Sequence, residues 1–269
     1  MNQSSLTPEQ VTNFHRDGYV LVPSLFNAEE TNLIRQIAHS DAQLSQNAID
    51  RHDKAGNTTR IALKNRLGED IYSAVARSER IVSAMETLLE DEVYHYHHKM
   101  TMKEPYVGGA WEWHQDYGYW YNNGCLFPDM ASVMIAVDRS TKQNGCLQVL
   151  RGSHKMGRIE HGKVADQTGA DLDRVEQALK RLDLVYAEME AGDALFFHSN
   201  TLHRSDANHS PDPRWTLICC YNTKHNDPYK EHHHPNYHAL ERWEDSRVLE
   251  VAKREMAELQ SAGIVLSLP

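Results

Sequence analysis

The sequence has no long hydrophobic run, no excess of positive charge and few cysteines. Its longest apolar stretches, such as ALFF and LICCY, are far shorter than the ~20 residues that cross a bilayer. The first ten residues contain no basic start followed by an apolar run, so no secretory signal is expected. The 28 Lys and Arg stand against 38 Asp and Glu, for a net charge of -10. This balance disfavours partners such as nucleic acid or an anionic membrane, because binding to either depends on clustered positive charge.

The four cysteines, Cys125, Cys146, Cys219 and Cys220, form no CxxC pair. Cys219 and Cys220 would face opposite sides of a strand, so they are not expected to bridge each other. Free thiols indicate a reducing compartment, and we therefore expect a cytoplasmic protein. The 40% hydrophobic and 25% charged residues are ordinary for a globular protein. Without a linker or repeat, the chain is predicted to form one domain, residues 1–269.

Helical patterns precede strand patterns along the chain. Thr7 and Asn27 each stand at the N-cap of a predicted helix, with a capping-box Gln or Glu three positions later. Apolar spacing predicts further helices over 71–90 and 241–260. Residues 41–70 are polar, and DRHDKAGNTTR, residues 50–60, is interpreted as a loop.

The period changes at residue 93, where strand-length segments rich in β-branched and aromatic residues begin. Turns that contain Gly or Asn separate them, and one helical stretch, DLDRVEQALKRL, interrupts them. The segments are VYHYHHKMTMK, SVMIAVDR, CLQVLRGSH, LVYAEM, DALFFHSNTLHRS and WTLICCYNT. The order predicts a mainly antiparallel sandwich or barrel of the jelly-roll kind, with the early helices packed against it.

The stretch WHQDYGYW, residues 113–120, places His114 and Asp116 two positions apart among aromatic rings. An exposed ion pair beside core aromatics is the simplest interpretation. In a strand, however, residues i and i+2 point to the same face, so both polar groups would enter one aromatic-lined space. That convergence favours a metal site, which needs at least one further ligand.

The third ligand is sought in DALFFHSNTLHRSDANHSPDPRW, which contains His198, His203 and His209. His203 is followed eleven positions later by Arg214, at the start of the next apolar strand. A guanidinium there suits a carboxylate held at a fixed distance from the metal. Two His and one carboxylate form the facial triad of non-haem Fe(II) oxygenases. The same ligands with an open position also suit a catalytic zinc ion.

These segments resemble the phytanoyl-CoA dioxygenase family, Fe(II)- and 2-oxoglutarate-dependent oxygenases built on a double-stranded β-helix. The resemblance begins with FHRDGYVLVPSLFNAEE, continues through KEPYVGGAWEWHQD and NGCLQVLRGSH, and ends with AGDALFFHSNTLHRSDANHSPDPRW. The motifs occur in the family's order and cover most of the chain. The resemblance implies a mainly β fold with flanking helices and a jelly-roll or cupin-like core.

The resemblance also implies the cofactors and their ligands. Fe(II) would be bound by His114, Asp116 and His203, with 2-oxoglutarate and O2 as cosubstrates. Four further residues fall where related hydroxylases contact or line the cosubstrate. Arg214 would pair with the distal carboxylate of 2-oxoglutarate, Ser205 and Thr101 would add polar contacts, and Trp120 would be an aromatic lining residue. The implied reaction hydroxylates a C–H bond while 2-oxoglutarate is converted to succinate and CO2.

A small polar substrate is expected rather than a fatty acyl-CoA, since the chain is acidic and only moderately apolar. In the strand YHYHHKMTMK, residues His97, Lys99, Thr101 and Lys103 share one face, although Lys103 and Lys99 could instead extend into solvent. We expect His97 and Lys99 to hold an anionic group. Tyr117, Tyr119 and Tyr121 are the candidates for stacking on a cationic end.

The stretch WEWHQDYGYWYNNGCLFPDM resembles the branch of the family that hydroxylates aminoalkylphosphonates. Examples are 2-aminoethylphosphonate and its N-trimethyl analogue, hydroxylated at the carbon next to phosphorus. A hydroxylase of an amino acid or an ectoine-like zwitterion, or of an acyl-CoA, is the alternative. Two other classes remain open: a zinc hydrolase, and a non-catalytic relative that binds a metal or ligand.

Overall fold

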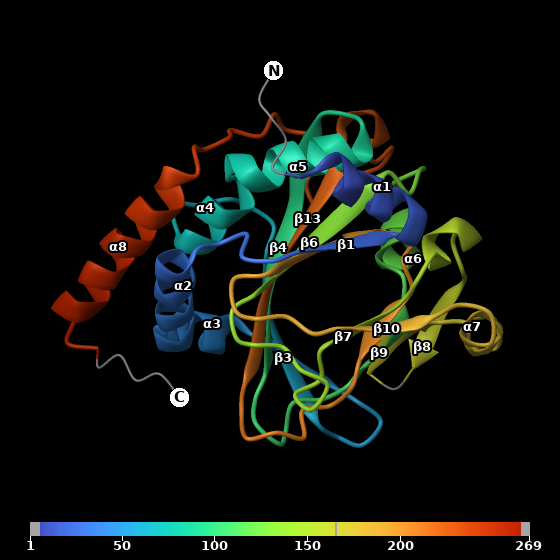
Figure 1. Ribbon diagram of the computed structural model, residues 1–269, viewed down its shortest axis with the longest axis horizontal. Helices are drawn as coiled ribbons and strands as arrows, with labels where there is room; N and C mark the ends of the chain where they lie inside the picture. Colours follow the sequence, from blue (N-terminus) through green and yellow to red (C-terminus); the bar gives the residue numbers. More distant parts are fainter. Residues whose placement is uncertain (1–5, 165, 265–269) are drawn as a thin grey trace.

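Two antiparallel sheets form the centre of the computed structural model, which describes residues 6–164 and 166–264 (Figure 1). The larger sheet has the order β1 (Tyr19–Val22), β11 (Ala194–His198), β6 (Met130–Ala136), β13 (Arg214–Thr223), β4 (Val93–Lys103), β3 (Thr58–Lys64) and β2 (Ile49–His52). The smaller sheet has the order β10 (Leu184–Ala187), β7 (Leu147–Leu150), β12 (His203–Ser205) and β5 (Trp111–His114). A separate hairpin joins β8 (His161–Val164) to β9 (Gln167–Ala170).

The helices gather mainly against one face of the larger sheet (Figure 1). They are α1 (Pro8–Asp17), α2 (Ala28–Ser40), α3 (Ala42–Asn47), α4 (Ile71–Ala76), α5 (Glu79–Leu89) and α8 (Ser246–Ser261). Two others lie elsewhere: α6 (Asp116–Trp120) follows β5, and α7 (Leu172–Leu179) follows the β8–β9 hairpin. The architecture confirms the predicted mainly β fold with flanking helices.

Alternation along the central strands divides the core into two layers. In β13, Leu217 and Cys219 pack toward the helices, while Ile218 and Cys220 pack between the two sheets. This is the period-2 pattern of a strand that is covered on both faces. Cys219 and Cys220 therefore point in opposite directions, as predicted, and all four cysteines are free and buried.

The predicted caps of the first two helices are confirmed. Thr7 accepts a hydrogen bond from the Gln10 backbone, and Asn27 accepts from Glu29 and Glu30. Both helices carry a complete capping box, which satisfies amide groups that have no partner inside the helix.

Three boundaries differ from the sequence-based expectation. The stretch 71–90 forms two helices, because Trp243 pairs with Ser78 and its backbone also bonds to Arg77 and Glu79 at the break. The last helix begins at Ser246 rather than at 241, because the backbone of Trp243 takes part in this pairing instead of in a helix. The expected loop 50–60 instead forms the β2–β3 hairpin, whose turn is fixed by the Asp53 carboxylate, and α3 precedes it in the polar stretch.

A bulge in β4 determines which of its side chains face the interior between the sheets. The register against β13 shifts because Cys220 pairs with His97 and Tyr221 pairs with His95, leaving Tyr96 as an extra residue. Tyr96 and His97 consequently both reach the interior, followed by Lys99 at the usual alternation.

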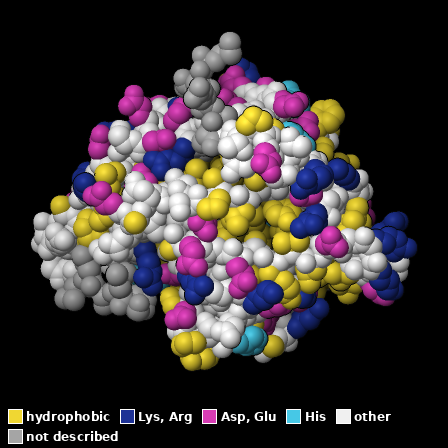
Figure 2. Space-filling model, viewed as in Figure 1, with side chains coloured by type: hydrophobic (Ala, Val, Ile, Leu, Met, Phe, Trp, Pro, Cys, Tyr) yellow, Lys and Arg dark blue, Asp and Glu magenta, His cyan; other side chains and the backbone are white. Residues whose placement is uncertain are grey.

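The described residues include no helix with the length and apolar character needed to cross a bilayer. Figure 2 shows one face of the molecule, on which Lys and Arg side chains are interspersed with Asp and Glu.

The buried carboxylate of Asp138 connects α2 to the larger sheet. It accepts hydrogen bonds from Arg35 Nε at 2.8 Å, from His39 Nε2 at 2.9 Å and from the Trp215 backbone N–H at 2.9 Å. Replacing Asp138 with Ala leaves these donors unpaired and should lower the free energy of unfolding by about 2–4 kcal/mol, measured by urea titration. Glu190→Ala, which breaks an exposed ion pair with Arg139, is the control and should cost about 0.5 kcal/mol or less. Equal losses in the two variants would contradict this role of Asp138.

Candidate metal and cosubstrate site

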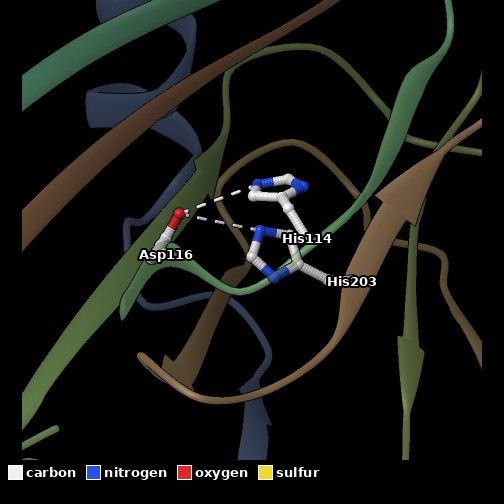
Figure 3. A group of neighbouring side chains, drawn as sticks. All are labelled: His114, Asp116 and His203. Carbon is white, nitrogen blue, oxygen red and sulfur yellow. Dashed lines mark ion pairs between the residues drawn. The ribbon is translucent and has the colours of Figure 1, made fainter. Parts of the chain in front are cut away.

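His114, Asp116 and His203 converge at the edge of the smaller sheet (Figure 3). His203 on β12 lies directly opposite His114 on β5, and their ring centroids are 4.0 Å apart. Asp116 Oδ1 lies 3.7 Å from His114 Nε2 and 3.9 Å from His203 Nε2. These separations are too long for hydrogen bonds but leave room for an ion that all three atoms contact. The predicted ligands are thus brought together.

Each imidazole is oriented by a backbone carbonyl two residues before it. His114 Nδ1 lies 2.8 Å from Glu112 O, and His203 Nδ1 lies 2.9 Å from Thr201 O. A carbonyl oxygen only accepts, so each Nδ1 carries the proton and each Nε2 presents a lone pair. Ser132 on β6 donates to Asp116 Oδ2 at 2.9 Å, which leaves Oδ1 directed at the imidazoles. Such outer contacts are what fix metal ligands in place.

The surroundings favour the protonation states that bind a metal. Burial and the neighbouring His203 lower the pKa of His114 well below its usual value, and burial lowers the pKa of His203. Both imidazoles are therefore neutral at physiological pH. Two neutral imidazoles and one carboxylate, all 5% exposed or less, fit a divalent iron ion.

The prediction that residues 113–120 form one strand is wrong. The strand ends at His114, and Asp116 is the first residue of α6. Gln115, fully buried, holds the bend: its amide donates to the carbonyls of Gly157 and Asn200 at 2.8 Å. Asp116 reaches the site because of this bend.

Gly118 allows α6 to approach the β8–β9 hairpin. A Cβ at this position would lie 2.2 Å from the ring of His161, and that ring accepts a hydrogen bond from the Gln115 backbone. The glycine and the imidazole together keep the helix that carries Asp116 in position.

A small cavity between the sheets is lined by all three ligands and by Lys99, Thr101, Lys103, Ser205 and Arg214, among others. Three of the four predicted cosubstrate residues are therefore in one place. The fourth, Trp120, is not: it lines a second cavity, where its ring lies edge-on to those of Tyr96 and His97.

Two buried cations stand side by side in the first cavity. Arg214 and Lys103 are directly opposite each other on β13 and β4, and they are 3% and 1% exposed. Lys103 Nζ donates to Ser205 Oγ at 2.8 Å, while Arg214 Nε has no hydrogen-bond partner. Burial lowers the pKa of Arg214 to about 10, and burial together with Arg214 lowers the pKa of Lys103.

No carboxylate forms an ion pair with either cation in the described part of the chain. Adjacent buried cations without a counter-ion are costly, and a bound dianion would offset that cost. The arrangement accordingly fits a dicarboxylate that reaches from the cations to the metal ligands. The interpretation that Lys103 extends into solvent is wrong.

The second cavity also borders the metal ligands. It shares Lys99, Trp111, His114 and Asp116 with the first. Its remaining lining residues include Arg51, His97, Tyr119, Trp120, Asn122, Asn123, His161, Asp166, His233 and His234. The candidate metal site thus borders both a small cavity that contains the buried cations and a larger cavity.

Only some of the predicted substrate contacts lie in the second cavity. His97, Lys99 and Tyr119 do. Tyr117 is buried in the core, where its hydroxyl donates to Cys125 O, and Tyr121 is 44% exposed beneath the Arg158 guanidinium. Tyrosines two positions apart share a face in a strand, but this segment is helical, so they diverge.

Sequence reasoning missed several residues of the second cavity. Arg51 and His161 belong to hairpins that carry no functional motif, and His233 and His234 lie in the segment EHHHP, residues 231–235. The run of histidines was the only signal available for the last two. Nothing in the spacing connects them to β4.

Comparison with known proteins matches most of the chain to one family. Residues 14–216 match the family model described as phytanoyl-CoA dioxygenase. An ectoine dioxygenase from Stutzerimonas stutzeri is 24% identical over 82% of this chain and 78% of its own length. An L-proline trans-4-hydroxylase from Streptomyces griseoviridis is 31% identical over 60% of this chain and 66% of its own length. A probable alpha-ketoglutarate-dependent hypophosphite dioxygenase from Stutzerimonas stutzeri is 27% identical, covering 79% and 77%.

Solved structures agree in fold. EctD from S. alaskensis with 2-oxoglutarate and 5-hydroxyectoine superposes with a TM-score of 0.76 at 22% identity, covering 91% of this chain and 89% of EctD. A second EctD structure contains bound Fe and superposes with the same TM-score. These neighbours confirm the predicted double-stranded β-helix core, and together with the relatives they confirm the predicted enzyme class and cofactors. The chain belongs to the phytanoyl-CoA dioxygenase family of iron- and 2-oxoglutarate-dependent oxygenases.

Proposed function

We propose that the protein hydroxylates a small zwitterion, and that its substrate is an aminoalkylphosphonate. 2-Aminoethylphosphonate or its N-trimethyl analogue would be hydroxylated at the carbon next to phosphorus. The observation that carries this proposal is the basic second cavity beside the metal ligands, lined by Arg51, Lys99 and several imidazoles.

His114, Asp116 and His203 would hold Fe(II), which when bound supplies O2 activation coupled to oxidative decarboxylation of 2-oxoglutarate. The residues of the chain position both reactants. Arg214 and Lys103 bind the distal carboxylate of 2-oxoglutarate through charge-assisted hydrogen bonds, and Ser205 fixes the Lys103 ammonium. Each turnover would consume one O2 and one 2-oxoglutarate, convert one C–H bond into C–OH, and release one succinate and one CO2.

Lys99 is the cation best placed to hold the substrate. It lines both cavities and makes no hydrogen bond or ion pair within the described residues. An anionic group bound there would set the neighbouring carbon beside the metal ligands. The aromatic rings of Tyr119 and Trp120 offer a surface for the cationic end.

The alternatives fit less of the site. A zinc hydrolase or a passive sensor gives no role to the paired buried cations Arg214 and Lys103 beside a facial triad. An ectoine-like or amino-acid zwitterion is the second candidate, favoured by the ectoine dioxygenases and the proline hydroxylase among the relatives. The hypophosphite dioxygenase is named for a phosphorus oxyanion, which supports the phosphonate.

The first prediction concerns the metal ligands. His114→Ala and His203→Ala each remove one of three bonds to the ion and should abolish substrate turnover and weaken iron binding, measured by equilibrium dialysis. Asp116→Ala should retain part of the iron through the two imidazoles. His209→Ala, an exposed histidine in the same stretch as His203, is the control and should behave as wild type. Full coupled hydroxylation by either His114 or His203 variant would rule out the triad.

The second prediction concerns the cosubstrate. Arg214→Ala removes a buried charged partner of the distal carboxylate and should raise the KM for 2-oxoglutarate by about 100-fold, since such contacts are worth roughly 2–5 kcal/mol. Iron content should stay nearly unchanged. Arg139→Ala, at an exposed ion pair, is the matched control. Unaltered 2-oxoglutarate kinetics in Arg214→Ala would exclude this role.

The third prediction concerns the substrate. Iron-loaded protein with 2-oxoglutarate and O2 should shift the phosphorus NMR signal of 2-aminoethylphosphonate or its N-trimethyl analogue, with one succinate formed per product. Ectoine, proline and an acyl-CoA are tested in parallel. An unshifted phosphonate signal beside brisk coupled turnover of another compound would overturn the substrate assignment and leave the iron site intact.

A further inference from the structure

The histidine run in EHHHP, residues 231–235, forms part of the substrate cavity wall. His233 and His234 line this cavity, although the segment lies far from β4 in the sequence. The ring of His234 stacks on that of His97, with centroids 4.5 Å apart and planes inclined by 17°. His97 is 2% exposed and His234 is 8% exposed, so the two rings form a buried pair at the cavity.

Asn65, just after β3, holds this segment against the sheet. Its Nδ2 donates to His233 O at 2.8 Å, and its Oδ1 lies 2.7 Å from His234 Nδ1. Because a carbonyl only accepts, the first bond fixes the orientation of the amide, and His234 Nδ1 must donate to the second. The remaining ring nitrogen of His234, Nε2, is therefore free to contact a ligand.

His97 carries an unsatisfied group into the same wall. Its Nδ1 is buried and has no hydrogen-bond partner within the described structure. His97 faces inward on the same side of β4 as Lys99, next to the bulge at Tyr96, and Trp120 packs edge-on against its ring with centroids 5.9 Å apart. A buried ring nitrogen without a partner is costly, so His97 carries a polar group that the described residues leave unsatisfied.

The charges around the two rings favour an anion. Lys99 lies two positions after His97 on the same face of β4, and Arg51 adds a second cation from β2. The carboxylates of the lining are Asp116, assigned to the metal, and Asp166 on the β8–β9 hairpin. Without Asp116, cations and imidazoles outnumber carboxylates at this wall.

We propose that His97, His234 and Lys99 form a subsite that selects a tetrahedral phosphonate over a planar carboxylate, with Asn65 as the positioning residue for His234. The inference rests on the proposed function and names the residues that determine its substrate class. Three donors from two separate segments can each meet one oxygen of a phosphonate. A carboxylate offers two coplanar oxygens and leaves one donor unpaired.

The subsite gains its full charge only with the ligand bound. Burial and the adjacent His233 and His232 lower the pKa of His234 to about 3 in the free protein. A dianion against the ring favours the imidazolium, whose Nε2–H then donates.

The test is direct binding without turnover. The protein is loaded with Fe(II) and 2-oxoglutarate under anaerobic conditions, and 2-aminoethylphosphonate is compared with its carboxylate counterpart, 3-aminopropanoate, by calorimetry. Wild type should bind the phosphonate at least about tenfold more tightly, as expected for one additional charged hydrogen bond. His234→Ala and Asn65→Ala should each weaken phosphonate binding and reduce this preference, with little change for the carboxylate.

His238→Ala is the control, because His238 is exposed in the same part of the chain and lies outside this cavity. Asn65→Ala tests the subsite without altering the cavity wall itself, and thermal unfolding verifies that each variant is folded. Equal affinity of wild type for the two compounds, or an unchanged preference in folded His234→Ala, would overturn the subsite. A His234-dependent preference without hydroxylation of the phosphonate would instead reject the proposed substrate and keep the subsite.

Discussion

The pairing of β12 with β5 is the contact on which the rest of the site depends. It places His203 directly across from His114, so that two imidazoles from segments 89 positions apart face one ion. The adjacent strand β7 pairs with β12 on its other side and holds it at the centre of the smaller sheet. Asp116 completes the set only because Gln115 ends the strand and turns the chain into α6. Loss of that strand pairing would separate the ligands without changing any of them.

The two cavities follow from the same arrangement. The smaller sheet supplies His114 and His203 and the following helix α6 supplies Asp116, while the facing strands β4 and β13 supply Lys99, Lys103 and Arg214. Lys103 and Arg214 lie at one end of the β4–β13 ladder, and His97 lies nearer its middle, immediately before the bulge at Tyr96. In the proposed assignment, the same strand pair binds the cosubstrate anion at Lys103 and Arg214 and the substrate anion near His97, with Lys99 between them on β4.

Sequence alone could predict the parts of the site that depend on local spacing and on family motifs. His114, Asp116, His203 and Arg214 belong to this group, and so does the alternation that puts Lys99 and its neighbours on one face. Of the three predicted tyrosines only Tyr119 lines the second cavity, because the segment becomes helical after residue 114 and the three side chains diverge. Trp120, expected from the family resemblance to line the cosubstrate, lines the second cavity instead.

Other features depend on tertiary contacts that no local pattern encodes. The bulge at Tyr96 changes which residues of β4 face inward, and only the pairing with β13 reveals it. The segment of His233 and His234 has no regular period, and its position is set by Asn65 from another part of the chain. The burial of Lys103 likewise depends on Ser205 and Arg214, which approach from two other strands.

The central claim is that the triad and the paired cations form one site, in which a metal and a dicarboxylate are bound together. Calorimetry of 2-oxoglutarate and of glutarate, with and without Fe(II) under anaerobic conditions, tests it most directly. Fe(II) should increase the affinity for 2-oxoglutarate much more than for glutarate, because both compounds reach Arg214 and Lys103 but only the keto acid can also chelate the ion. By linkage, 2-oxoglutarate should tighten iron binding by the same factor. Iron-independent binding of 2-oxoglutarate, or equal enhancement of glutarate, would contradict the account.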